Sequence, residues 1–244
     1  MISVCMATYN GSRFIKQQIL SILEQLSDID ELVISDDGST DETLEIINNF
    51  KDSRIKLLHH TPTCDFSNHE KVTANFENAL NHCRGDYIFL TDQDDVWKSN
   101  KVKYCLSFFE KFDFIFHNKT TIDIKGTIKE ISGYKENPLR KFWICLLIKF
   151  KLNGCCMAFK RECLKFLLPF PKKLIAHDYW IGLLCLKLCR CTFIEDPLMF
   201  YRIYEGSVSY KQNTSFLYKL KYRYKLLVQI YMRIKEYKTK ITEK

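Results

Sequence analysis

Three carboxylates lie close together directly after a short apolar segment. Residues 87–91 read Tyr-Ile-Phe-Leu-Thr, and Asp92, Asp94 and Asp95 follow within four positions. Carboxylate oxygens suit hard divalent cations, and Mg²⁺ is usually held by one or two carboxylates together with substrate phosphates. Because Asp is also a common turn residue, an ordinary acidic turn after a strand is the alternative.

Two more polar turns follow apolar segments nearer the amino terminus. Residues 2–7 precede Thr8 and Tyr9, and residues 31–35 precede a turn that contains Asp37. Each segment is followed by a helical pattern, and alternating strands and helices predict an α/β fold with a mainly parallel sheet and helices on both faces. In such sheets ligands bind at the carboxyl ends of the strands. We therefore expect the three turns to meet in one site.

The remaining pattern places these turns within one large domain. Strands are expected over residues 2–7, 31–35, 55–58, 87–90 and 155–159, and helices over 14–26, 72–82, 101–110, 161–168 and a segment ending at 47. A chain of 244 residues suits one α/β domain, and no repeat or linker interrupts it. We assign residues 1–210 to this domain and residues 211–244 to a basic tail.

Five segments together resemble family 2 glycosyltransferases with the GT-A fold, most closely the bacterial rhamnosyltransferase-like branch. They are residues 3–11, 35–41, 91–97, 153–159 and 177–180. They occur in the family's order over about residues 1–205. The resemblance implies that a nucleotide-diphosphate sugar lies across the strand ends.

The resemblance also implies roles for single residues. The donor-binding residues would be Thr8, Tyr9, Asp37 and Asp92, with Asp37 accepting a hydrogen bond from the base and Asp92 near the ribose. Asp94 would hold Mn²⁺ or Mg²⁺, with Asp92 and Asp95 as further candidate ligands. Such a cation offsets the charge that grows on a departing diphosphate.

Asp178 matches the catalytic carboxylate of this branch. An inverting transfer needs a base that removes the proton of the acceptor hydroxyl as its oxygen attacks the anomeric carbon. The alternative is that Asp178 only caps a helix, with Trp180 as core filling. His177 either orients Asp178 or lies nearby.

One segment departs from the family pattern. Where the branch usually carries Tyr-Arg-Gln-His, this chain has Tyr201-Arg202-Ile203-Tyr204. The phenol of Tyr204 is a poor substitute for a neutral imidazole ligand. We therefore expect weaker metal binding, or a larger share of the diphosphate charge for Arg202, which has several donors.

The basic charge of the chain is concentrated in its tail. The net charge is +8, and residues 211–244 hold ten Lys or Arg against two Glu, leaving 27 basic and 27 acidic residues elsewhere. Apolar residues recur at helical spacing at Leu220, Tyr224, Leu227, Tyr231 and Ile234. This pattern is typical of a helix on anionic lipid. A helix packed on the domain with a solvated basic face is the alternative, and nucleic acid is not an expected partner.

The cysteines and apolar segments bear on location. Eleven cysteines occur without a Cys-x-x-Cys pair, which disfavours a zinc site, and most lie in apolar runs, where reduced thiols behave as small hydrophobes. No signal peptide is evident, and residues 142–148 are too short a stretch to span a bilayer. We expect a cytoplasmic protein, peripheral on the inner face of a bacterial membrane.

The predicted activity is an inverting, metal-dependent glycosyl transfer. UDP-hexose and dTDP-rhamnose both suit the donor site, and the family resemblance implies a saccharide acceptor, often lipid-linked, in O-antigen, capsule or lipooligosaccharide synthesis. Nucleotidyl transfer on a similar sheet is one alternative, although no Gly-rich triphosphate loop follows the first strand. Non-catalytic binding of nucleotide sugar or lipid is another.

Overall fold

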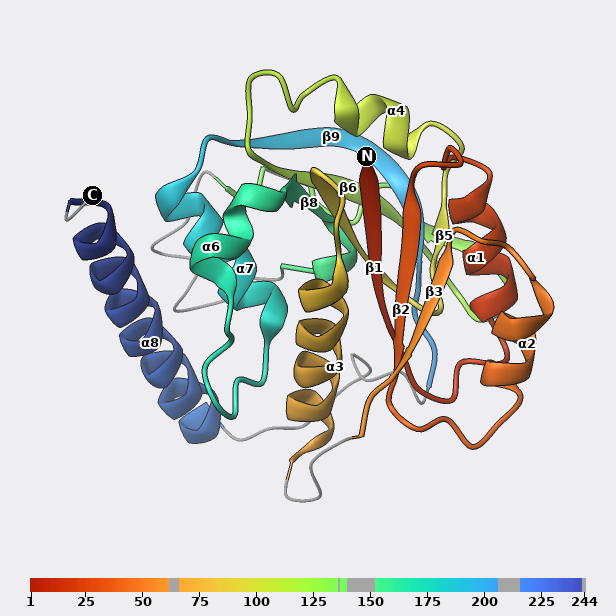
Figure 1. Cartoon of the computed structure of the whole chain (residues 1–244), viewed down its shortest axis with the longest axis horizontal. Coiled ribbons are helices and arrows are strands. Elements are labelled where there is room, and N and C mark those ends of the chain that lie inside the picture. Colours follow the sequence, from red (N-terminus) through yellow and green to blue (C-terminus); the bar gives the residue numbers. More distant parts are fainter. Residues whose placement is uncertain (62–65, 136, 140–151, 206–215, 243–244) are drawn as a thin grey trace.

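Nine strands form one curled sheet with helices on both faces (Figure 1). The computed structural model describes residues 1–61, 66–135, 137–139, 152–205 and 216–242. The strands are β1 Ile2–Thr8, β2 Glu31–Asp36, β3 Ile55–His59, β4 Tyr87–Asp92, β5 Val96–Trp97, β6 Phe114–Ile122, β7 Ile128–Glu130, β8 Met157–Lys160 and β9 Cys191–Arg202. The helices are α1 Ile15–Leu23, α2 Thr43–Asn49, α3 Asn68–His82, α4 Lys101–Leu106, α6 Leu164–Leu167, α7 His177–Leu188 and α8 Phe216–Thr242, with 3₁₀ turns η1 Gly154–Cys156 and η2 Arg161–Cys163.

The first four strands are parallel, in the order β3-β2-β1-β4. The centres of β2, β1 and β4 are apolar and buried, as expected for strands covered on both faces, whereas β3 at the sheet edge is half-buried. The chain moves outward through α1 and α2, then returns through α3 to place β4 on the other side of β1. Because such crossovers are right-handed, α3 covers the face opposite to α1 and α2. The carboxyl ends of β1 and β4 therefore form the switch point where open α/β sheets bind ligands.

The second half of the sheet is mixed, in the order β8-β6-β9-β5. β8 runs antiparallel to both β4 and β6, whereas β6 and β9 are parallel. The predicted strand at 155–159 begins instead as η1 and becomes β8 at Met157. β6 was not among the predicted strands, because its buried residues include His117, Asn118 and Lys119, which hide its strand pattern. The predicted α/β class and GT-A-like arrangement are confirmed.

The basic tail contains a long helix packed against the rest of the protein. α8 contacts α6 and α7 through the buried side chains of Leu226 and Ile230. Arg233 donates to the backbone oxygens of Phe166, Leu168 and Pro169 at 3.0, 3.2 and 2.6 Å. The expected apolar stripe is therefore only partly packed: Leu227 and Ile234 lie half-buried against the core, whereas Leu220, Tyr224 and Tyr231 are exposed.

The cysteines of the described residues are free thiols. Cys5, Cys83, Cys105, Cys163 and Cys185 are buried as expected and Cys189 is half-buried, whereas Cys145 and residues 142–148 lie outside the described residues. None of the described helices is long and apolar enough to cross a membrane.

Candidate active site

Gln93 joins the polar turn after β1 to the end of β4. Its Oε1 accepts hydrogen bonds from the Thr8 hydroxyl at 2.5 Å and the Tyr9 amide at 2.9 Å, and its Nε2 donates to the Tyr9 oxygen at 3.1 Å. A Cβ at Gly11 would lie 2.4 Å from the same Oε1, so any other residue there would displace the Gln93 side chain from this arrangement. Thr8 is buried and Tyr9 is exposed. Gln93 lies within the acidic segment, but its sequence context alone assigned it no role.

The turn after β2 lies beside the turn after β1. The Asp37 amide donates to the Thr8 oxygen at 3.0 Å, and the Asp37 side chain is only 7% exposed. Its Oδ1 lies 2.6 Å from Nδ1 of His60. Burial raises the pKa of Asp37, against the opposing effect of His60. The structure thus brings Thr8, Tyr9 and Asp37 together at one edge.

The carboxylates after β4 point to different partners. Asp95 is buried, its Oδ1 accepts from the Arg202 amide at 3.1 Å, and its Oδ2 has no hydrogen-bond partner. Asp94 accepts a hydrogen bond from the Tyr204 hydroxyl, and Asp92 accepts one from the Cys155 thiol.

Burial raises the pKa of all three acids because it disfavours a charged carboxylate. For Asp92 the nearby charge of Asp94 adds to burial, and the pKa rises to about 6. For Asp95 both neighbouring acids add to burial. The three carboxylates therefore lie in an environment that favours a cation.

Two of these carboxylates converge on a position that suits a divalent cation. Oxygens of Asp92 and Asp95 and Sγ of Cys155 all lie within 4.8 Å of one another. The unpartnered oxygen of Asp95 and the hard carboxylate donors fit Mg²⁺ or Mn²⁺. The Asp94 carboxylate is not part of this group, so its role as metal ligand stays a prediction.

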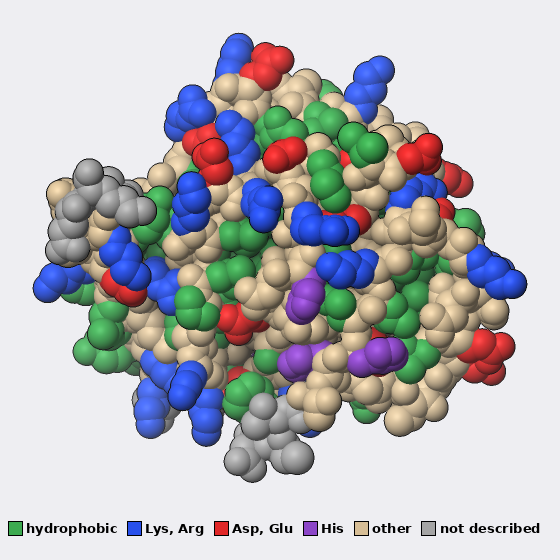
Figure 2. All heavy atoms as spheres, in the orientation of Figure 1, with side chains coloured by type: hydrophobic (Ala, Val, Ile, Leu, Met, Phe, Trp, Pro, Cys, Tyr) green, Lys and Arg blue, Asp and Glu red, His purple; other side chains and the backbone are tan. Residues whose placement is uncertain are grey.

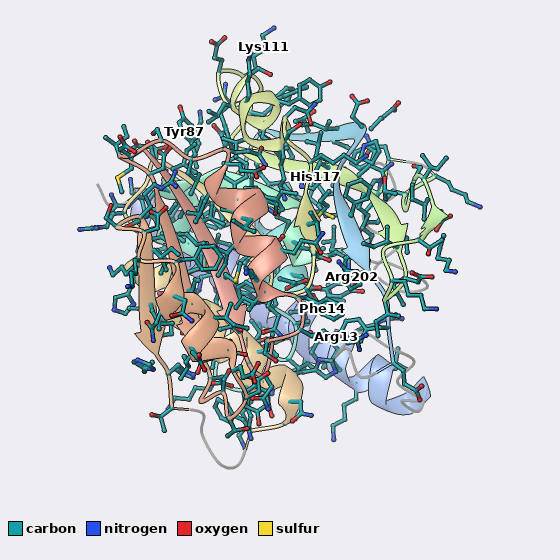
Figure 3. The ribbon with its side chains drawn as sticks, turned by 90° about the vertical axis from the view of Figure 1, so that its right-hand side faces the viewer. Arg13, Phe14, Tyr87, Lys111, His117 and Arg202 are labelled. Atoms are coloured by element: carbon teal, nitrogen blue, oxygen red, sulfur yellow. The ribbon has the colours of Figure 1, made fainter. Side chains whose placement is uncertain are left out.

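Arg202 uses most of its donors within the protein. Its Nε donates to the backbone oxygen of Asp94 at 2.9 Å, and its Nη2 donates to Oε1 of Gln17 at 3.1 Å. The guanidinium lies 4.5 Å from the Phe14 ring centroid, and Figure 3 shows the two side chains together. Arg202 is only 5% exposed and holds the acidic turn against α1. Its contact with a diphosphate stays a prediction.

Asp178 lies in the first turn of α7, close to Asp92 at the end of β4. Its Oδ1 accepts from the Tyr179 amide at 2.8 Å. Burial raises the pKa of Asp178 to about 7, and the nearby charge of Asp92 also raises it. A Cβ at Gly154 would lie 3.6 Å from Cβ of Asp178, while the adjacent Cys155 contacts Asp92. η1 therefore lies between the two carboxylates.

His177 does not act as a cation beside Asp178. Its ring stacks on Phe76 with centroids 4.1 Å apart, and burial lowers its pKa to about 3. The cation whose charge favours ionised Asp178 is Lys119. Lys119 is buried in β6 and donates to Oδ1 of Asn153 at 2.7 Å.

Asn153 is the centre of a small polar network next to η1. Its Oδ1 also accepts from the Tyr134 hydroxyl at 2.6 Å, and Nζ of Lys119 lies 3.4 Å from the Tyr201 ring centroid. Sequence reasoning quoted Asn153 within a family segment without a role and missed Lys119, because no sequence pattern links distant positions 119, 153 and 178.

Comparison with known proteins decides the class of this site. The sequence model of the family described as Glycosyl transferase family 2 matches residues 3–167. This chain belongs to glycosyl transferase family 2. The predicted enzyme class, a glycosyltransferase, is confirmed, and the matched region contains the turns after β1, β2 and β4.

Several curated relatives carry related names. An uncharacterized glycosyltransferase of Haemophilus influenzae is 34% identical over 86% of this chain and 82% of its own length. WfgD of Escherichia coli, named a UDP-Glc:alpha-D-GlcNAc-diphosphoundecaprenol beta-1,3-glucosyltransferase, is 30% identical over 86% of this chain and 79% of its own. The dTDP-rhamnosyl transferase RfbG of Shigella flexneri is 27% identical over 98% and 82%.

Solved structures share the fold. TarS of S. aureus, in complex with UDP-GlcNAc, superposes with a TM-score of 0.71 at 19% identity, covering 96% of this chain and 66% of that one. The mannosyltransferase PcManGT of Pyrobaculum calidifontis, in complex with GDP-Man and Mn²⁺, gives 0.61 at 20% identity over 84% and 58%. This chain thus spans about two thirds or less of these structures, and the likeness shows the fold.

Of two hollows in the glycosyltransferase, one lies far from the acids and the other lies beside the acidic turn. One of about 710 Å³ includes Asp86 and Tyr87 at the amino end of β4, opposite to the switch point. The other, of about 440 Å³, lies beside Arg202 and Phe14 (Figure 3). The acids at the strand ends, rather than the larger hollow, identify the candidate site.

The two tryptophans of the family segments are packing residues in this glycosyltransferase. Trp97 and Trp180 are buried. Their indole N–H groups donate within the protein, to the Thr91 hydroxyl at 3.0 Å and the Leu167 oxygen at 2.9 Å. Neither ring is available to a substrate.

Proposed function

We propose that this enzyme transfers a sugar from a nucleotide-diphosphate sugar to a hydroxyl of a saccharide acceptor, with inversion at the anomeric carbon. The observation that carries this proposal is the position of Asp178, a half-buried carboxyl across η1 from Asp92. A base and a cation-binding group on either side of one short turn suit a single displacement.

The proposed reaction is a single displacement at the anomeric carbon. The acceptor oxygen forms a bond to the anomeric carbon, and the bond from that carbon to the diphosphate oxygen breaks. Its electron pair leaves with the nucleoside diphosphate, and the acceptor proton passes to the Asp178 carboxylate. A pKa of about 7 suits this role, because a base works best when its pKa is near the working pH.

The carboxylates after β4 would hold the cation. Asp92 and Asp95 supply the converging oxygens, and Asp94 is the further expected ligand. Bound Mg²⁺ or Mn²⁺ supplies positive charge that offsets the charge growing on the leaving diphosphate. The Mn²⁺ in the related mannosyltransferase structure supports this use. Lys119 and Arg202 remain as fixed cations around the acids.

The donor and acceptor follow from the relatives' names. WfgD is named for UDP-Glc and an undecaprenol diphosphate acceptor, and RfbG for a dTDP-rhamnosyl transfer. We infer a UDP-hexose or dTDP-rhamnose as donor, and a lipid-linked saccharide of bacterial surface polysaccharide synthesis as acceptor. The family match does not support nucleotidyl transfer.

Hydrolysis of a donor panel tests this function without knowledge of the acceptor. Purified protein with Mn²⁺ should slowly hydrolyse one of UDP-glucose, UDP-GlcNAc or dTDP-rhamnose, and EDTA should stop the reaction. D178N should bind that donor with unchanged affinity in calorimetry while its hydrolysis is lost. Full turnover by D178N would refute Asp178 as the base.

We also propose that α8 rests on an anionic membrane surface. Leu220, Tyr224, Val228 and Tyr231 recur every three or four residues, and Met232 follows Tyr231. All five are exposed, Tyr224 by 71% and Tyr231 by 69%. Exposed lysines lie along the same helix at 221, 225, 235 and 238. Figure 2 shows Lys and Arg side chains around hydrophobic ones at the left of the molecule, over α8. Each basic group near anionic lipid contributes about 1 kcal/mol.

Point variants test the membrane proposal better than deletion, because removing α8 would uncover its packed face. The double variant Y224S/Y231S should sediment several-fold less with phosphatidylserine vesicles than the parent protein. I29S is the matched control, since Ile29 is 70% exposed and lies far from α8 in the sequence. Equal sedimentation of both variants would refute the proposal.

A further inference from the structure

Three thiols from two segments meet at the carboxyl end of α7. Cys163 ends η2, while Cys185 and Cys189 lie four residues apart on the last turn of α7 and at its C-cap. Their Sγ atoms all lie within 4.8 Å of one another, with 3.5 Å between those of Cys163 and Cys189. A tetrahedral Zn²⁺ with Zn–S bonds of about 2.3 Å places its sulfurs about 3.8 Å apart. The observed spacing is close to that value.

We propose that Cys163, Cys185 and Cys189 form a binding site for a thiophilic divalent cation of the Zn²⁺ class. Thiolates are the ligands such ions prefer, and helical positions four residues apart lie on one face. A helix carboxyl end carries partial negative charge, which also favours a cation there. Cys163 and Cys185 are buried, whereas half-buried Cys189 leaves a path for the ion and a coordination position for water.

Two neighbouring side chains, Asp113 and Cys191, interact with other groups and are not ligands of the proposed site. The Asp113 carboxylate accepts from Lys160 at 3.1 Å and Arg190 at 3.0 Å, so it is already paired with two cations. Cys191 points its Sγ at the backbone oxygens of Cys185 and Cys189, 3.2 and 3.5 Å away. The site therefore has three protein ligands, and Cys191 lies outside it.

Ordinary packing of reduced thiols is the competing explanation. Cys105 shows that pattern in the core, since it is fully buried and belongs to no group of three ligands. Within the described residues, Cys163, Cys185 and Cys189 are the only three thiols that converge in this way. Metal binding would release their protons to solvent, so affinity should rise with pH.

The site would tie η2 to α7, whose other end carries Asp178. With about 1.5 Å of rise per residue, positions 178 and 189 lie about 16 Å apart along the helix. The proposed ion is thus separate from the acidic site and acts on the position of α7 rather than on the reacting atoms.

Cobalt titration of the full chain tests the proposal. Reduced, EDTA-treated protein should take up one Co²⁺ with the thiolate-to-cobalt charge-transfer and tetrahedral ligand-field bands, and Zn²⁺ should displace it. The bands should disappear in C189S, whose half-buried position makes it the substitution best tolerated by folding. Zn²⁺ should also raise the midpoint of thermal unfolding of the parent protein but not of C189S.

Two control variants show which thiols produce the cobalt bands. C191S should keep the bands, because Cys191 is a half-buried neighbour outside the site, and C155A should keep them, because Cys155 belongs to the acidic site. Circular dichroism confirms that each variant is folded. Any of three results would overturn the proposal. The first is that the bands are lost in C155A but kept in C189S, and the second is that the parent protein shows no bands. The third is a Cys163–Cys189 disulfide found by mass spectrometry under the reducing conditions of the titration.

Discussion

The two ends of α7 lie beside different kinds of ligand atoms, carboxylate oxygens at one end and thiol sulfurs at the other. At the amino end, Asp178 lies beside carboxylates, and burial with the charge of Asp92 raises its pKa to about 7. At the carboxyl end, Cys163, Cys185 and Cys189 bring three sulfurs together. Hard oxygen donors and soft sulfur donors favour different cations. One helix therefore carries a candidate reaction site at one end and a separate group of thiols at the other.

This difference shows how a short helix can serve two sites without mixing them. Between its ends, Trp180 and Leu184 are fully buried, and Arg233 of α8 lies 5.2 Å from the Trp180 ring centroid. The middle of α7 is held by packing, so a change at one end should leave the chemistry at the other end intact. The following predictions test that separation.

The largest difference in kcat is expected between the variants D178N and C189S. Without a base for the acceptor proton, kcat of D178N should fall by about 10²–10⁴-fold. C189S should keep kcat within about twofold, since its side chain touches no reacting atom. Steady-state kinetics of the two folded variants at saturating donor checks this. A similar loss of kcat in both would show that the two ends are not independent.

Removing Arg233 should destabilise the whole helix packing. R233A loses three hydrogen bonds to the backbone oxygens of residues 166, 168 and 169, and the free energy of unfolding should fall by about 2–3 kcal/mol. K235A, an exposed substitution on the same helix, should change it by less than about 0.5 kcal/mol. Urea unfolding of both variants measures the difference.

A methyl group at Gly154 should disturb only the amino end of α7. Its Cβ would lie 2.9 Å from Nε2 of His177, whose ring is stacked on Phe76 and has little room to move. We expect G154A to lower kcat about tenfold while cobalt binding at the thiols stays unchanged. Loss of both properties would mean that the strain spreads along the helix.

The pH dependence should report Asp178. A base works only when ionised, so kcat/KM should be lost as pH falls through about 7, the value to which the pKa of Asp178 is raised. At pH 6 we expect about one tenth of the high-pH value. His177 does not explain this limb, because burial lowers its pKa to about 3. A flat profile between pH 5.5 and 8 would contradict the assignment.

The parallel half of the protein was largely predictable. β1, β2, β3 and β4 begin at the expected residues and end within two residues of the expected ends, because their apolar segments stop abruptly at polar turns. α3 begins at Asn68 rather than near Val72, since Ser67 and Glu70 form a capping box that lengthens it. The expected meeting of Thr8, Asp37 and Asp92 follows from this topology.

The second half was less predictable because its buried residues are polar. All of β6 is buried, including Asn118 and Lys119, whose side chains are satisfied by partners far along the chain. A pattern of apolar residues does not reveal such a strand. The packed face of α8 was likewise centred on buried Leu226 and Ile230, and of the expected stripe only Leu227 and Ile234 contribute to it.

The sequence by itself determined the family, the parallel strand ends and the acidic residues gathered there, since local patterns and motif order carry that information. Only the tertiary structure decided that Asp94 faces Tyr204 while Asp92 and Asp95 converge, and that Arg202 is committed to protein partners. It alone brought Lys119 into contact with Asn153 and placed the thiol of Cys163 near those of Cys185 and Cys189. These meetings depend on packing between segments distant in sequence, which no local pattern encodes.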